Sequence, residues 1–459
     1  MPVDLSDFIL PNIKVYRGGI LQFVLSVFIT LTSLFIAIPG LAQPQATGQM
    51  LSLEEAINVA LKNHPAIVEY KERSLAAKSQ IGVSRANLFP QATHSTSYYY
   101  GNSVPSTGIN LPSGGPAFAS SSGVISDYVV HRNTVNQLLY DFGKTLGQIG
   151  QSKAQYEVSK MDLANTRQQV VLDAKNAFYG YLAAQRAVKV SEENVRLNED
   201  LVRQAKGFYQ VGVKAKIDVT TAEANLYNAQ ADLITARNTF QISQVSLMTA
   251  LGLKSWPYAG LTFQLDTQPK LIDLNEAKDK AFSSRPEYLK NQFQQKADQE
   301  ALRSAKAGYF PTLTSQGVQN TQGKAYGGMR DTWSVSVQMN FPLFEGLATT
   351  YAVRQAKASL RATESNTEVL RQDINKQVEQ SYLDVGAAAE RIRSTEKAKQ
   401  AARENWDLAQ GRYKAGVGSI IEVTDAQVKF FQAELNYIRS VYDLKTAEAG
   451  LERAIGKAY

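Results

Sequence analysis

The sequence contains no cysteine and only three histidines among its 459 residues. Without thiols the chain has no disulfide bonds, no thiolate metal ligands and no cysteine to carry a lipid anchor. Three histidines leave little for a metal cluster, and His64, directly before Pro65, is expected to end a helix. We find no phosphate-binding glycine loop and no serine–histidine–aspartate pattern. We therefore expect neither catalysis nor a bound cofactor or metal.

Charge of one sign is not concentrated anywhere along the chain. The 49 lysines and arginines and the 42 aspartates and glutamates give a net charge of +7. Nucleic-acid binding needs a dense basic surface, and no basic run of that kind occurs. The charges are interpreted as the solvated faces of helices, and no nucleic-acid partner is expected.

Long apolar runs are confined to the N-terminus. Lys14 and Arg17 precede an apolar run at 20–38, and the residues up to Ala42 suit cleavage by signal peptidase. Residues 1–42 are therefore predicted to be a signal peptide, and the rest of the chain is predicted to be exported. The run is nearly long enough to span a bilayer, so a retained membrane anchor is the alternative.

One segment of the sequence occurs twice, at a constant offset of 204 residues. Residues 207–252 and 411–456 align without a gap and are identical at 13 of 46 positions. Chance gives about three identities over that length, so the segment is an internal repeat. Each copy is predicted to be a helix, a tight turn and a second helix.

Glycine and an acid mark the turn in both copies. Gly212 and Gly416 supply the left-handed backbone that commonly ends a helix. Asp218 and Glu422 follow at matching positions, where an acid in a first turn suits the helix dipole. Beyond the turn, small and large residues alternate at spacings of three and four, which predicts a close-packed helical seam. The seam residues are Ala222, Leu226, Ala229, Leu233, Ala236, Phe240, Ser243, Leu247 and Ala250, and then Ala426, Phe430, Ala433, Tyr437, Ser440, Leu444, Ala447, Leu451 and Ala454.

The duplication extends over the rest of the chain. Helices predicted at 51–63 and 274–284 each end before a proline, and helices at 66–88 and 287–309 each end at a Phe-Pro pair. After each Phe-Pro pair the helical period disappears and a β-hairpin is predicted. The predicted domains are a signal peptide at 1–42, a first repeat at 43–252 with a β-hairpin at about 89–141 and a helical hairpin at 143–252, an equatorial linker at 253–273, and a second repeat at 274–459 with a β-hairpin at about 310–344 and a helical hairpin at 346–456.

The last of the extended stretches alternates cleanly between apolar and uncharged polar side chains. Alternation with a period of two is typical of a membrane strand with lipid on one side and water on the other. A half-buried strand of a soluble sheet is the alternative. The expected lipid-facing residues are Trp333, Val335, Val337, Met339 and Phe341, and Tyr98, Tyr99 and Tyr100 fit an interfacial aromatic girdle.

Four strands are predicted in the chain, at 91–100, 124–140, 312–319 and 332–344. Four strands cannot close a barrel, and an open edge in lipid leaves backbone groups unpaired. If the strands span a membrane, several chains must share one barrel, and three chains would supply twelve strands. The helical runs between strands and turns, at 143–211 and 346–415, are each about 100 Å long at 1.5 Å per residue.

Taken together, these features resemble the TolC family of outer membrane efflux proteins. The resemblance covers residues 50–456 and includes Tyr-Asp-Phe-Gly and Phe-Glu-Gly after the strands and the two repeated turns. It implies a mainly α fold with a small transmembrane β part, in which a homotrimer forms a 12-stranded β-barrel continuous with a 12-helix α-barrel. It also implies that the protein lies in the outer membrane, with its helical part in the periplasm.

The resemblance implies a function and partners as well. It implies the channel-tunnel of a tripartite efflux pump or type I secretion system, a passive exit duct gated at its helical tips by docking of an adaptor. The implied partners are a periplasmic membrane-fusion adaptor, an inner-membrane pump of the RND or ABC type reached through it, and outer-membrane lipid. A periplasmic coiled-coil adaptor anchored by the N-terminal apolar segment is the alternative.

By motif position, the resemblance assigns roles to residues of the two turns. The periplasmic gate and selectivity residues are Asp218, Tyr413, Glu422 and Asp425, and the adaptor contacts are Gly212, Val213, Lys214, Gly416, Val417 and Gly418. The sequence departs from the family pattern twice. Some members carry an arginine where Gly418 stands, so a salt bridge to Asp218 is not available from there, and Thr221 replaces an acid at the partner of Asp425.

Overall fold

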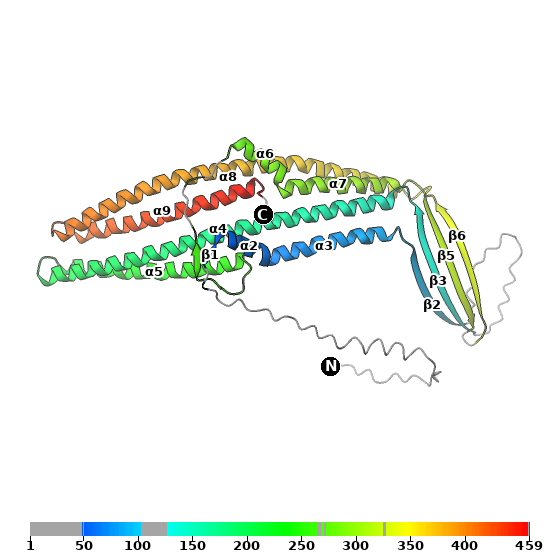
Figure 1. Ribbon diagram of the computed structural model, residues 1–459, viewed down its shortest axis with the longest axis horizontal. Coiled ribbons are helices and arrows are strands. Elements are labelled where there is room, and N and C mark those ends of the chain that lie inside the picture. Colours follow the sequence, from blue (N-terminus) through cyan, green and yellow to red (C-terminus); the bar gives the residue numbers. More distant parts are fainter. Residues whose placement is uncertain are drawn as a thin grey trace, which may run out of the picture.

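The chain forms one elongated body with a β-sheet at one end and two helical tips at the other (Figure 1). The computed structural model describes residues 48, 50–101, 126–263, 268–269, 272–324, 327–457 and 459. The predicted signal peptide and the predicted loop between the first two strands lie outside these residues. The described part is mainly helical, which confirms the predicted class.

Two helices run from the sheet to the tips. They are α4 (Lys144–Gln210) and α8 (Ala348–Lys414), and each is 67 residues long. A short turn at each tip reverses the chain into a returning helix, α5 (Lys216–Ala250) or α9 (Ile420–Ala454). Every predicted seam residue of the two returning helices is buried or half-buried, so the small–large alternation does mark their packed face.

Shorter helices complete the half of the body nearest the sheet. Helix α3 (Pro65–Ala86) lies along α4, and α7 (Pro286–Ala307) lies between α4 and α8 (Figure 1). Both helices have proline at their first position, where the missing N–H costs nothing because it would have no helical acceptor. Each long helix is thus accompanied by one short helix toward the sheet and one returning helix toward the tips.

Two short helices lie in the middle of the body, and the sequence predicted the bounds of one of them correctly. Helix α2 (Leu53–Asn63) begins two residues later than predicted because Ser52 caps it. The Ser52 hydroxyl accepts from the Glu55 backbone N–H, and the Glu55 carboxylate accepts from the Ser52 backbone N–H. Helix α6 (Leu274–Ser284) has the predicted bounds.

A two-stranded parallel sheet beside these helices was not predicted. It pairs β1 (Met50–Ser52) with β4 (Gly260–Thr262). Three-residue strands are too short to show an alternating pattern, so no periodicity indicates them. The largest of the apolar clusters lies here, around the fully buried Phe178, Leu247 and Leu251.

The four strands at the end of the body form one antiparallel sheet. Along the sheet, their order is β2 (Gln91–Gly101), β3 (Ser126–Tyr140), β5 (Thr312–Lys324) and β6 (Met329–Asn340). Each repeat therefore contributes one hairpin, and the two hairpins pair through β3 and β5. Strands β2 and β6 are the two edges.

The bounds of the second hairpin correct the sequence prediction. Strand β5 continues five residues past Gln319 to Lys324, and Gly323, expected in a loop, pairs with Met329. Strand β6 ends at Asn340, so Phe341 lies just beyond the strand that was predicted to contain it. The physical reason is Pro342, which has no N–H to continue the ladder.

Candidate functional site

The two tip turns have the backbone geometry predicted for them. Gly212 has φ +75° and Gly416 has φ +80°, so both lie in the left-handed region. Each helix end is closed by backbone N–H groups from the turn, with Val213 donating to Phe208 and Val417 to Arg412. Both valine side chains remain exposed in the chain, at 57% for Val213 and 73% for Val417. Each turn thus exposes one valine side chain at the end of the molecule opposite the sheet.

Tyr413 and Asp218 meet between the two tips. The Tyr413 side chain is fully buried, and its hydroxyl donates to the Asp218 carboxylate at 3.4 Å. Phe208, from the other repeat, packs edge-on against the Tyr413 ring. Burial, and then the nearby Asp218 charge, raise the pKa of Tyr413 to about 12. The phenol therefore remains a protonated donor at neutral pH.

Lys214 makes a second link between the tips. Its ammonium donates to the backbone carbonyl of Gly416 at 3.2 Å and to that of Gly418 at 2.8 Å, and it lies 5.4 Å from the centre of the Tyr413 ring. Both carbonyls belong to the turn between α8 and α9, so the lysine of one tip binds the backbone of the other. Sequence reasoning assigned Lys214 an adaptor contact and missed this link.

A signal for that link exists in the repeat alignment. Lys214 and Gly418 occupy the same position of the two repeats, 204 residues apart. Gly418 is tightly enclosed, because a Cβ there would come within 2.9 Å of the Tyr413 backbone nitrogen. At this position the first repeat therefore has a lysine, and the second repeat has a glycine whose backbone carbonyl accepts a hydrogen bond from that lysine.

The two remaining predicted gate residues lie apart from this cluster. Glu422 and Asp425 are exposed on the first turns of α9. Glu422 lies 3.8 Å from Arg412, and Asp425 pairs with Lys429 at 2.8 Å. Among the described residues, the structure thus brings Asp218, Tyr413, Lys214, Gly416 and Gly418 together and leaves both acids on an open surface.

The edge strand β6 has one apolar face. The apolar residues Trp333, Val335, Val337 and Met339 alternate with the polar residues Ser334, Ser336, Gln338 and Asn340. The four apolar residues are each 64% to 80% exposed. Because alternate residues of a strand point to opposite faces, the apolar set shares one face and the polar set the other. Contiguous exposed apolar side chains of this kind are typical of protein or membrane contact surfaces.

Polar residues in the same face satisfy one another. The register places His94, Asn133, Gln319 and Trp333 in one row across the four strands. His94 Nδ1 lies 2.7 Å from Asn133 Oδ1, and the Asn133 amide donates to Gln319. Asn133 of β3 is therefore paired with a polar side chain on each neighbouring strand.

Aromatic side chains gather at both ends of the strands. At the junction with the helices, Phe142 lies 4.7 Å from Tyr140 and 5.2 Å from Phe310, measured between ring centroids. At the far end of β2, Tyr98, Tyr99 and Tyr100 are exposed. Aromatic belts above and below an apolar band are the arrangement seen in outer-membrane barrels.

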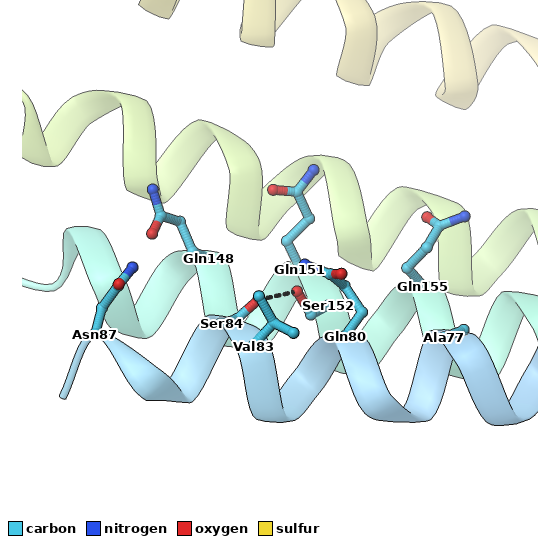
Figure 2. A pocket seen from close by; sticks show the side chains of 9 residues that line it. All are labelled: Ala77, Gln80, Val83, Ser84, Asn87, Gln148, Gln151, Ser152 and Gln155. Atoms are coloured by element: carbon cyan, nitrogen blue, oxygen red, sulfur yellow. Dashed lines mark hydrogen bonds between the residues drawn. The ribbon is translucent and has the colours of Figure 1, made fainter. Parts of the chain in front are cut away.

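Several hollows open along the described part of the helical body. Figure 2 shows one between α3 and α4, where Ser84 and Ser152 share a hydrogen bond of 2.7 Å. Its lining consists of Ala77, Gln80, Val83, Ser84, Asn87, Gln148, Gln151, Ser152 and Gln155. None of these side chains ionises near neutral pH, so the hollow holds neither a general base nor a nucleophile activated by one.

Across the ranges that the structure describes, no cluster of three or more histidine, cysteine or carboxylate side chains is placed to hold a metal ion. No helix in that part of the chain combines the length and apolar character required to cross a bilayer.

Known structures share this architecture. The Campylobacter jejuni CmeC outer membrane channel superimposes with a TM-score of 0.75 at 16% identity, over 88% of this chain and 85% of that one. The fold is therefore that of outer-membrane channel proteins. The model of the outer membrane efflux protein family matches residues 56–253 and 278–457, and the chain belongs to that family.

Relatives in sequence agree with this assignment. Outer membrane protein TolC of Vibrio cholerae is 24% identical over 419 residues, covering 88% of this chain and 90% of the relative. The probable efflux pump outer membrane protein TtgC of Pseudomonas putida is 23% identical, covering 88% and 83%. The predicted family and the outer-membrane localisation are confirmed, and the periplasmic adaptor alternative is set aside. The relatives named here are channel and outer membrane proteins rather than enzymes.

Proposed function

We propose that three copies of this chain form one exit duct, with twelve strands closing a barrel in the outer membrane and twelve helices continuing it into the periplasm. The observation that carries this proposal is the four-stranded sheet with free edges at β2 and β6. The apolar face of β6 suits contact with lipid, and in lipid an unpaired strand edge is costly because its backbone groups find no hydrogen-bond partner. Pairing β6 of one copy with β2 of the next removes every edge once the ring closes.

The helices support the same arrangement. Large apolar side chains remain exposed along two helices of the single chain, and such surfaces on a soluble helix usually cover a partner. On α5 they are Tyr227, Ile234, Ile242 and Val245, and on α8 they are Tyr351, Val369, Leu383 and Leu408. Helices of neighbouring copies would cover these side chains in a closed ring.

The tips act as the gate of this duct. The links from Tyr413 to Asp218 and from Lys214 to the carbonyls of Gly416 and Gly418 hold the two tips of a chain together. Three copies of Glu422 and Asp425 near one axis would form an acidic constriction that attracts cations. Opening requires the links to break, and docking of a periplasmic adaptor on the exposed tip turns supplies the free energy.

The duct itself does no chemistry and is driven by its partners. An adaptor would connect the tips to an inner-membrane pump of the RND or ABC type, in an efflux or a type I secretion system. The exposed Val213 and Val417, together with the flanking Gly212, Lys214 and Gly416, form the surface that the adaptor would contact, whereas Gly418, also predicted as a contact, is buried behind it.

Cross-linking tests the shared barrel. The chain has no cysteine, so one cysteine placed in β2 and one in β6 can react only with each other. Strands β3 and β5 separate the two positions within a chain, which is too far for a disulfide. A series of pairs built on Ser95 or Ser97 with Ser334 or Ser336 should give linked dimers and trimers in outer membranes, and no larger species.

The control pair lies within one sheet. Cysteines at Gln316 and Ser336, which are register partners on β5 and β6, should link inside the chain and give only monomers on gels. If every β2–β6 pair also yields only monomers, the shared barrel is wrong.

A further inference from the structure

A polar cavity lies where α9 ends and α7 begins, between the two long helices. The two helix ends meet closely, because a Cβ on Gly456 would come within 2.8 Å of the Arg285 backbone nitrogen. The cavity has a volume of about 460 Å³. Its charged lining residues are Arg285, Glu287, Asp384 and Arg453, and glutamines and a serine provide most of the rest.

Arg285 is buried without enough partners. Its side chain is only 5% exposed. One terminal nitrogen donates to Gln377 at 2.8 Å, and Nε lies 3.4 Å from the Glu287 carboxylate. The other terminal nitrogen, Nη1, is buried and has no hydrogen-bond partner among the described residues. A buried guanidinium with an unused N–H is costly, and native structures usually supply an acceptor.

Arg453 also has a buried N–H group without an acceptor among the described residues. Its terminal nitrogen donates to Asn165 and to Glu287, but its Nε is buried without a partner in the described part of the chain. Burial acts to raise the pKa of Glu287, but Arg453 and Arg285 outweigh it, so the pKa is lowered and the carboxylate is charged. The buried guanidinium of Arg285 and the partly buried guanidinium of Arg453 therefore share one carboxylate.

The N-terminus of α7 adds to the positive potential in the cavity. Arg285 is the residue before the helix, and its side chain does not cap the first N–H groups, so the positive end of the helix dipole faces this region. Asp384 is the opposing charge at the cavity, and its exposure to solvent reduces its field without removing it.

We propose that this cavity binds a small oxyanion, which accepts hydrogen bonds from Arg285 and Arg453 at the junction of α7 and α9. The ligand chemistry is that of inorganic phosphate or of a carboxylate group. The bound anion joins the second repeat's sheet-side helix to its returning helix and to α4 of the first repeat, through Asn165 on Arg453. It therefore stabilises the middle of the body, whether or not the chain works as a duct.

Calorimetric titration of the full-length, detergent-solubilised protein with inorganic phosphate, at constant ionic strength, tests the proposal. Saturable binding is expected, and Arg285→Gln should weaken it by about tenfold or more. Arg391→Gln is the matched control, because Arg391 is an exposed arginine of α8 that pairs with Asp443. This variant should bind phosphate like the parent. Acetate in a second titration distinguishes a phosphate site from a carboxylate site.

Asp384→Asn provides a test that does not depend on Arg285→Gln folding. Removal of the opposing charge should tighten phosphate or acetate binding several-fold. Absence of saturable binding of both anions, equal binding by Arg285→Gln and the parent, or unchanged binding by Asp384→Asn would overturn the proposal. None of these results depends on export activity, so the proposed duct stands or falls separately.

Discussion

The hydroxyl of Tyr413 donates to the carboxylate of Asp218 across the two repeats, but the equivalent pair is not made within the chain. The repeat positions that correspond to Tyr413 and Asp218 are Tyr209 and Glu422. Tyr209 is half exposed, and Glu422 is exposed beside Arg412. In a ring of alternating repeats, the missing pair falls between neighbouring copies.

Tyr413→Phe should loosen the tip. The variant keeps the buried ring but removes the hydroxyl, and one such hydrogen bond contributes about 1 kcal/mol. That loss corresponds to about a fivefold shift from closed to open tips. Single-channel recording in planar bilayers should show a larger resting conductance. Tyr156→Phe, on α4 near the sheet, is the control and should leave conductance unchanged.

Alkaline pH should open the same link. The folded-state pKa of Tyr413 is raised to about 12, from an ordinary value of about 10. A raised pKa stabilises the folded tip fully below about pH 10, and the contribution is lost as pH rises through about 12. Resting conductance should therefore be flat between about pH 6 and 9 and rise above about pH 10. A rise complete by about pH 8 that Tyr413→Phe removes would contradict the assignment.

Tyr209→Phe should weaken the contact between copies rather than within one. By the symmetry of the repeats, the Tyr209 hydroxyl of one copy would donate to Glu422 of the next. The variant should raise resting conductance, and Glu422→Gln should have a similar effect because a neutral acceptor holds a weaker hydrogen bond. The double variant should add little to either single one. Fully additive effects would show that the two side chains do not interact.

Lys214→Met should release the second link at the tip. The long apolar side chain keeps the packing against Tyr413 but cannot donate to the carbonyls of Gly416 and Gly418. Protease cleavage at the tip turns should therefore become several-fold faster, because cleavage follows the population of opened states. Lys216→Met, two residues along on α5, is the matched control. Equal cleavage of the Lys214 variant and the parent would show that the link does not hold the tip.

Much of this architecture could be read from the sequence, because it depends on local rules. The left-handed glycines of the turns, the small–large seam of α5 and α9, and the alternation of β6 each follow from spacing along one element. The end of β6 before Phe341 could also have been predicted from Pro342, which cannot donate to the ladder.

Contacts between distant segments could not be predicted in the same way. The link from Lys214 to the carbonyl of Gly418 joins two turns through a backbone acceptor, and the repeat alignment shows only that the two residues occupy matching positions. The pairing of His94 with Asn133 depends on the register of β2 and β3, which the sequence alone left open. The shortage of acceptors at Arg285 appears only once four helices are placed around it.

The number of chains in the detergent-solubilised particle tests the central claim most directly. Native mass spectrometry of the purified mature protein should give the mass of three chains, because four strands per chain leave edges that only a closed ring can pair. A particle of one chain, soluble in water without detergent, would contradict the account.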